Sequence, residues 1–293
     1  MIRQYLEGEV ALAAAFDKDY IAQLDGIGMP GRSVMGMAPQ QGARKSRSLG
    51  QSLEFADYRD YAPGDDPRRI DWKGFGRTQR LFTKLFNEER QASLLVLVDT
   101  SASMDFGTPN KLRFAKLLAA SLAYLALKNA DSVRIASLGG GPSEEVEATS
   151  RLGFGRVVGL LDALVPSGVA QMRLPRAAPG ACFVLSDFLH DPKDVGHDAM
   201  VKQLAQAKQD AVLLHILSPE EAEPTLDGYY RLKDAETGAQ QEILITRDVL
   251  KSYNQALDDL QVSIRSACQK TKAVYGTVQT DDNILELVAG RIR

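Results

Sequence analysis

The chain has 293 residues, of which 44% are hydrophobic and 25% are charged. This balance is typical of a soluble globular protein and excludes global disorder. Two cysteines exclude a disulfide framework and a thiolate zinc site, and three histidines leave little for a histidine-based metalloenzyme.

The longest uncharged apolar run covers residues 117–127, well short of the ~20 residues needed to span a bilayer. The N-terminus carries acidic residues ahead of a short apolar stretch, whereas a secretory signal needs basic residues and a longer apolar core. We therefore expect a cytoplasmic protein.

Positive charge is concentrated in residues 31–84, which hold eleven Lys/Arg and six Asp/Glu although the whole chain has a net charge of −3. Arg44, Lys45 and Arg47 belong to this stretch and are the residues that we expect to contact a partner. Such a region could bind nucleic acid or an acidic protein, or its arginines could pair with the nearby aspartates. The whole-chain pI of 5.7 argues against a nucleic-acid binder.

The N-terminal third has no strong core pattern. Residues 1–25 predict one or two short helices, and residues 26–50 predict an extended loop. Residues 53–61 and 81–86 are candidate strands, with a run of turn-forming residues at 62–67 between them. We expect residues 1–90 to be an extension that packs on the domain formed by residues 91–293.

The rest of the chain alternates strands and helices. Strands buried on both faces are predicted at 93–99 and 181–187, further strands at 132–138 and 211–217, and an antiparallel strand at 146–152. Helices are predicted at 111–129, 157–164 and 200–208. A β-hairpin at 229–232 and 242–246, a helix at 247–271, a strand at 274–278 and a helix at 283–289 complete the chain. The pattern predicts a doubly wound, mostly parallel α/β sheet with a C-terminal hairpin.

Two of the predicted strands end in oxygen-bearing side chains. The first is followed by Asp99, Ser101 and Ser103, and a later one by Asp187. Ligands of open parallel sheets bind at the carboxyl ends of the strands, and hard divalent cations prefer oxygen ligands. These four residues are therefore a candidate Mg²⁺ or Mn²⁺ site.

The Asp-x-Ser-x-Ser pattern at 99–103 resembles the metal-ion-dependent adhesion site of von Willebrand factor type A domains. The stretches 55–72 and 77–90 resemble the signature of the bacterial domain of unknown function 58 family. The residues of this signature that we single out are Arg59, Asp65, Asp66, Arg68, Arg69 and Trp72. We expect them to tie the N-terminal extension to the α/β domain.

The resemblance implies a von Willebrand type A-like domain that acts with a MoxR-type AAA+ ATPase as a chaperone or metal-insertion adaptor. It also implies that Ser101 and Ser103 bind the cation directly, while Asp99 and Asp187 hold it directly or through water. The ATPase, or the client protein on which it acts, then supplies an Asp or Glu to an open coordination position. The family's threonine ligand is missing, since Val169 and Ala170 stand in its place, and Ser167 is the nearest hydroxyl.

Simpler interpretations of the same residues remain. Asp99 and Ser101 could cap the following helix, Asp187 could be a turn former, and His190 could lie in a solvated loop near the site. Trp72 and the surrounding arginines could be internal packing.

Three function classes follow. The first is a non-enzymatic adaptor that uses a cation, and the second is a scaffold with a decayed metal site that binds through its basic region. The third is a magnesium-dependent phosphoryl-transfer or hydrolytic enzyme with Asp99 as nucleophile. The sequence has no phosphate-binding loop and no nucleophile elbow. We therefore expect no enzymatic activity and no nucleotide.

Overall fold

The computed structural model describes residues 1–27, 54–87, 92–138, 144–168, 174–189, 196–235 and 237–290. The described residues fall into two compact units. One joins residues 1–27 to those from 92 onward, and the other is formed by residues 54–87.

The larger unit is built on a six-stranded sheet with the strand order β10-β7-β6-β3-β4-β5. Its strands are β3 (Ser93–Val98), β4 (Ser132–Ser137), β5 (Glu145–Ala148), β6 (Ala181–Ser186), β7 (Asp210–Leu217) and β10 (Val274–Gln279). All neighbours are parallel except β5, which pairs antiparallel with β4 at one edge. The predicted doubly wound, mostly parallel sheet is confirmed.

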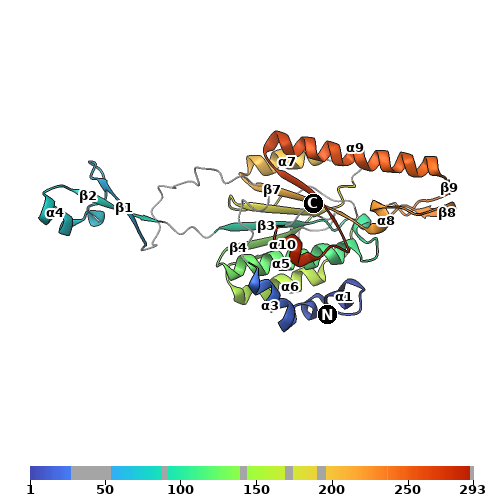
Figure 1. Ribbon diagram of the computed structural model, residues 1–293, viewed down its shortest axis with the longest axis horizontal. Coiled ribbons are helices and arrows are strands. Elements are labelled where there is room, and N and C mark those ends of the chain that lie inside the picture. The colour runs from blue at the N-terminus through green and yellow to red at the C-terminus, as the bar shows by residue number, and fades with distance from the viewer. Residues whose placement is uncertain are drawn as a thin grey trace. The chain divides into compact units, whose positions relative to one another are not determined.

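Helices cover both faces of the sheet (Figure 1). On one face lie α5 (Lys111–Lys128), α6 (Phe154–Ala163) and α10 (Ile284–Val288), and on the other lie α7 (His197–Gln206) and α9 (Arg247–Thr271). Along β3, Val96 joins the α5 core and Leu97 joins the α7 and α9 core. Burial on both faces explains why the central strands are continuous apolar runs.

Three short helices at the N-terminus belong to the same core. They are α1 (Ile2–Leu6), α2 (Leu12–Ala15) and α3 (Lys18–Gly26). Tyr5, Leu12, Tyr20 and Leu24 are fully buried in the α5 core, and the hydroxyls of Tyr20 and Ser121 lie 2.7 Å apart. The expected boundary near residue 90 therefore differs from the structure, because residues 1–27 supply core side chains to the sheet unit.

The smaller unit pairs β1 (Glu54–Asp60) antiparallel with β2 (Phe82–Asn87). A 3₁₀ turn, η1 (Pro67–Arg69), and the helix α4 (Trp72–Thr78) connect the two strands. Both strands were expected, but α4 was not. Its seven residues include Gly74 and Gly76, and glycine disfavours a helix interior.

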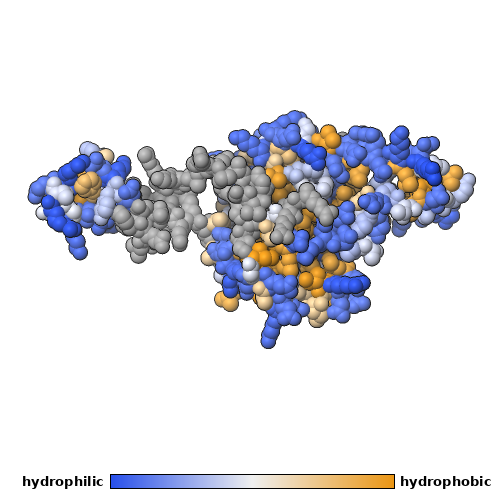
Figure 2. Space-filling model, viewed as in Figure 1, coloured by the Kyte–Doolittle hydropathy of each residue, from blue (hydrophilic) through white to orange (hydrophobic). Residues whose placement is uncertain are grey.

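The remaining elements are η2 (Ala102–Met104), η3 (Arg151–Gly153), α8 (Pro219–Ala222) and a hairpin of β8 (Gly228–Lys233) and β9 (Gln240–Ile245). The predicted hairpin is confirmed. Leu232 and Leu244 of the hairpin are exposed, whereas Ile245 is buried. Figure 2 shows hydrophobic residues interspersed among hydrophilic ones on the surface of the molecule. In the part of the chain that the structure describes, every helix is too short or too polar to cross a lipid bilayer.

Candidate functional site

The carboxyl ends of β3 and β6 bring Asp99 and Asp187 to the same edge of the sheet. The two strands are adjacent and parallel, and both aspartates are completely buried. Burial raises the pKa of Asp99, and the negative charge of Asp187 raises it further. The predicted pair of carboxylates is thus close enough to interact.

Hydrogen bonds fix the carboxylate of Asp99 from two sides. The backbone amide of Ser101 donates to Oδ1 at 2.8 Å, and the hydroxyl of Ser186 donates to Oδ2 at 2.5 Å. Ser186 Oγ also accepts the backbone amide of Phe188 at 2.8 Å. Phe188 has a φ of 52°, a conformation that costs a bulky residue about 1–3 kcal/mol and is retained where the surroundings impose it. Ser186 directly precedes Asp187 but was not predicted as a site residue from the sequence.

The two predicted serine ligands meet the geometric requirement of a small divalent cation. Ser101 Oγ and Ser103 Oγ lie 3.0 Å apart. Neighbouring ligands of an octahedral Mg²⁺ at ~2.1 Å are separated by about 3.0 Å. Ser101 is fully buried beside Asp99, and Ser103 is half-buried. The two hydroxyls hydrogen-bond each other beside Asp99, so oxygen donors of the type that a hard cation prefers lie close together.

The loop after α6 lies against these serines. The backbone amide of Ser167 donates to the carbonyl of Thr100 at 2.7 Å, and the amide of Ala102 donates to the carbonyl of Gly168 at 3.1 Å. This is the loop in which the family resemblance places a threonine ligand. Val169 and Ala170 lie outside the described residues, and Ser167 is the hydroxyl-bearing residue whose backbone bonds to Thr100.

Lys111 was not predicted as a site residue, but it contacts Asp187. Its side chain is completely buried at the start of α5, and its Nζ donates to Asp187 Oδ2 at 2.8 Å and to Glu221 Oε1 at 2.7 Å. Burial alone would lower the pKa of Lys111, but the carboxylates of Asp187 and Glu221 outweigh it and raise the pKa. The lysine therefore stays charged at neutral pH.

Glu221 reaches Lys111 because α8 packs beside the Asp99 loop. The second oxygen of Glu221 accepts the backbone amide of Ser218 at 2.8 Å, and Ser218 Oγ accepts the amide of Glu221, which together form a capping box. Gly107 has a φ of 87° and approaches Ser218 so closely that a β-carbon at this position would overlap it.

Asp187 has a second partner besides Lys111. Its Oδ1 accepts the backbone amide of Leu189 at 3.1 Å.

Among the described residues, no three His, Cys, Asp or Glu side chains gather as a metal-binding group. A cation at this edge would therefore depend on the serine hydroxyls and water for part of its coordination.

The other predicted site residues lie elsewhere or outside the described residues. In the smaller unit, Arg59 donates to Asp65 at 2.6 Å, and the second oxygen of Asp65 accepts the hydroxyl of Thr83 at 3.0 Å. Asp66 accepts the backbone amide of Arg68, so these members of the signature contact one another within their own unit. Arg69 is half-buried, and Trp72 is 59% exposed. Arg44, Lys45, Arg47 and His190 lie outside the described residues.

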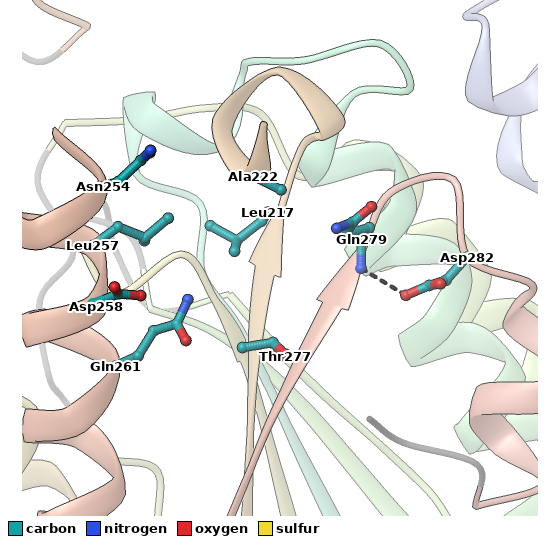
Figure 3. Close-up of a pocket in the computed structure, with 9 residues that line it drawn as sticks. All are labelled: Leu217, Ala222, Asn254, Leu257, Asp258, Gln261, Thr277, Gln279 and Asp282. Atoms are coloured by element: carbon teal, nitrogen blue, oxygen red, sulfur yellow. Dashed lines mark hydrogen bonds between the residues drawn. The ribbon is translucent and has the colours of Figure 1, made fainter. Parts of the chain in front are cut away.

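A second feature of the carboxyl edge, which the sequence did not reveal, is a pocket of about 380 Å³ at the ends of β7 and β10. Figure 3 shows Asp258 and Gln261 reaching from α9 toward the strand ends. On the other side, Asp282 accepts the backbone amide of Gln279 at 2.7 Å. The pocket also includes Ala222, the neighbour of Glu221, so α8 lies between it and the Asp99 cluster.

Two mycobacterial proteins resemble this chain over most of its length. They are the uncharacterized protein Rv1480 of Mycobacterium tuberculosis and the uncharacterized protein Mb1516 of Mycobacterium bovis. Each is 25% identical over 261 residues, which cover 83% of this chain and 81% of the relative.

Several solved structures have a similar chain path. An aerotolerance-related membrane protein from Bacteroides fragilis aligns with a TM-score of 0.44 at 16% identity, over 67% of this chain and 94% of that one. BatB from Bacteroides thetaiotaomicron aligns with a TM-score of 0.43 at 13% identity, over 68% of this chain and 95% of that one. The VWA domain of SpRpn10 aligns with a TM-score of 0.37 at 11% identity, over 68% of this chain and 94% of that one.

Residues 57–262 match the family described as "Protein of unknown function DUF58", a range that spans β1 of the smaller unit and all of the sheet except β10. The chain therefore belongs to the DUF58 family.

Proposed function

We propose that this protein is a non-enzymatic adaptor that binds a protein partner at the carboxyl edge of its sheet, around Asp99, Ser101, Ser103 and Asp187. The partner that we propose is a MoxR-type AAA+ ATPase, in keeping with the family resemblance. The adaptor would serve the ATPase in a chaperone-like or metal-insertion role.

The observation that carries this proposal is that each of three loops at a buried polar cluster carries an exposed apolar side chain. Phe106, Val165 and Leu189 are 49%, 67% and 46% exposed. Each comes from one of the three loops that hold the cluster together, which are the loops after β3, α6 and β6. Exposed large apolar side chains that surround a polar site are typical of surfaces that bind other proteins.

The proposed cofactor is Mg²⁺ or Mn²⁺, held by Asp99, Ser101 and Ser103, with Asp187 at the next strand end. When bound, the ion would offer a coordination position to an Asp or Glu of the partner. The chain's own residues orient the two hydroxyls and keep Asp99 in place through the Ser186 hydroxyl and the Ser101 amide.

Recognition suits this edge better than turnover. Both oxygens of Asp99 and both oxygens of Asp187 accept hydrogen bonds from nearby donors, so neither carboxylate is arranged as a free nucleophile. His215 is buried in β7, and its Nδ1 lies 2.8 Å from the hydroxyl of Tyr275. The ring is buried in the core and packs edge-on against Phe188, with the ring centres 5.7 Å apart.

Co-purification of the full chain with a MoxR-type ATPase from the same cell tests the proposal. We expect association that EDTA weakens and that Asp99→Ala abolishes. Failure to associate in every condition, combined with hydrolase activity that depends on Asp99, would favour the enzyme instead.

The alternative is a scaffold that binds without a divalent cation, and Lys111 favours it because a positive charge already pairs with Asp187. In that case association is insensitive to EDTA, falls with salt and weakens when Arg44, Lys45 and Arg47 are neutralised. The same co-purification separates the two candidates.

A further inference from the structure

Lys111 brings a positive charge into a cluster that otherwise favours cations. Its ammonium is completely buried, bonds to Asp187 and Glu221, and lies 5.7 Å from the centre of the Phe106 ring. Two carboxylates, those of Asp187 and Glu221, share this one lysine. The lysine therefore neutralises only part of their charge.

The hydrogen bonds divide the cluster into two parts. Asp187 and Glu221 are bound to Lys111, whereas Asp99 is bound to the Ser101 amide and the Ser186 hydroxyl. Ser101 and Ser103, the hydroxyl pair with the spacing of cation ligands, lie on the Asp99 side. Among the described residues of this cluster, Asp99 is thus the carboxylate that Lys111 is not shown to hold.

We infer that Lys111 is a built-in cation of this site, which occupies Asp187 and leaves Asp99, Ser101 and Ser103 as the part that can take a divalent ion. The inference rests on the proposed function and adds a specificity-determining residue to it. Its consequence is weak binding of a divalent ion to the free protein, because the ion lacks Asp187 and lies near a fixed positive charge. A carboxylate from the partner then replaces the missing ligand, so ion and partner bind more tightly together than separately.

Lys116 provides a matched control on the same helix. It is also buried, at 8% exposure, but its Nζ donates to the backbone carbonyls of Leu164 and Asp162. Replacing Lys116 removes a buried ammonium from α5 without changing a partner of Asp187.

The test is a titration of the full chain with Mn²⁺, followed by electron paramagnetic resonance of the free ion. It compares the wild type with Lys111→Met, Lys111→Gln and Lys116→Met. We expect both Lys111 variants to bind Mn²⁺ at least about tenfold more tightly than the wild type, because a nearby positive charge is removed and Asp187 becomes available. Lys116→Met should bind as the wild type does.

Thermal melting provides a second measurement on the same samples. The Lys111 variants should melt below the wild type without metal, because Asp187 is left buried and unpaired, and should gain more from Mn²⁺. Equal Mn²⁺ affinity in the wild type and both Lys111 variants would overturn the inference and leave the proposed cation site standing. Binding by the Lys111 variants alone would support the inference and remove the cation from the proposed function. No binding by any of them would overturn both.

Discussion

At the scale of single residues, the carboxyl edge depends on side chains that hold the two aspartates rather than on the aspartates alone. Ser186 connects the ends of β3 and β6, because its hydroxyl donates to Asp99 and accepts the amide of Phe188. Removing the hydrogen-bond donor of a buried carboxylate oxygen lowers the free energy of unfolding by about 1–3 kcal/mol. Ser186 is thus a positioning residue for Asp99.

Ser186→Ala should lower the free energy of unfolding by about 1–3 kcal/mol, because one buried oxygen of Asp99 loses its hydrogen bond. Urea denaturation followed by circular dichroism measures this change. Ser137→Ala is the matched control, since Ser137 also ends a central strand but makes only a 3.3 Å contact with the amide of Glu144. Equal losses in the two variants would argue against a special role for Ser186.

His215 predicts how stability depends on pH. Burial lowers the pKa of His215 to about 4, whereas a histidine in the unfolded chain titrates near ~6.5. Between these values the unfolded chain takes up a proton that the folded protein does not, so stability falls as the pH falls. Above about pH 6.5 both states are neutral at this residue, and its contribution disappears.

Between pH 7.5 and pH 5.0 the wild type should lose about 2 kcal/mol more unfolding free energy than His215→Gln. Tyr275→Phe, which removes only the hydrogen bond to the ring, should keep the wild-type pH dependence. Urea denaturation at the two pH values measures both effects. An identical pH dependence in the wild type and His215→Gln would show that this residue is not the source.

At the scale of elements, α8 is held in place by one side chain with two tasks. Glu221 caps its own helix and pairs with Lys111 at the start of α5. A helix of four residues is not stable on its own, so α8 depends on the Lys111–Glu221 contact and on its capping box.

Glu221→Gln should lower the free energy of unfolding by about 2–4 kcal/mol, because Lys111 keeps its buried charge and loses one of its two partners. Glu220→Gln, an exposed neighbour in the same helix turn, should change it by less than about 0.5 kcal/mol. Chemical denaturation of the two variants provides the comparison. An unchanged free energy of unfolding in Glu221→Gln would show that the Lys111–Glu221 contact does not stabilise the fold.

The elements also show what the sequence could and could not predict. Central strands such as β3 and β6 were predictable because burial on both faces requires an unbroken apolar run. The helix α4 was not predictable, because it is short and contains two glycines.

The positions of Asp99, Ser101, Ser103 and Asp187 were predictable because these residues directly follow strands. The contacts of Lys111 were not, because its partners lie 76 and 110 positions away in the sequence. Only the folded chain brings these charges together.

At the scale of the whole molecule, the N-terminal helices complete the sheet unit. Tyr5 and Leu12 are buried in its core, and Arg113 of α5 donates to the carbonyl of Tyr5 at 3.1 Å. Residues 54–87 form a separate compact unit with ion pairs of its own. The two parts of the N-terminal third thus have different structural roles.

Deleting residues 1–27 should expose the core face of α5 and cause aggregation, because several fully buried apolar side chains are removed. Replacing residues 54–87 with a short flexible linker should preserve cooperative thermal unfolding of the sheet unit. Scanning calorimetry and light scattering measure both outcomes. A soluble chain that unfolds cooperatively without residues 1–27 would contradict this assignment.

The central claim is that the partner binds around Asp99, and site-specific photo-crosslinking tests it most directly. A photoreactive amino acid replaces Leu189, at the edge of the cluster, or Leu152, which is 96% exposed in η3. Each protein is then irradiated with the MoxR-type ATPase. We predict a crosslink from position 189 that disappears with Asp99→Ala, and none from position 152. A crosslink from 152 alone, or one from 189 that is unaffected by Asp99→Ala, would contradict the account.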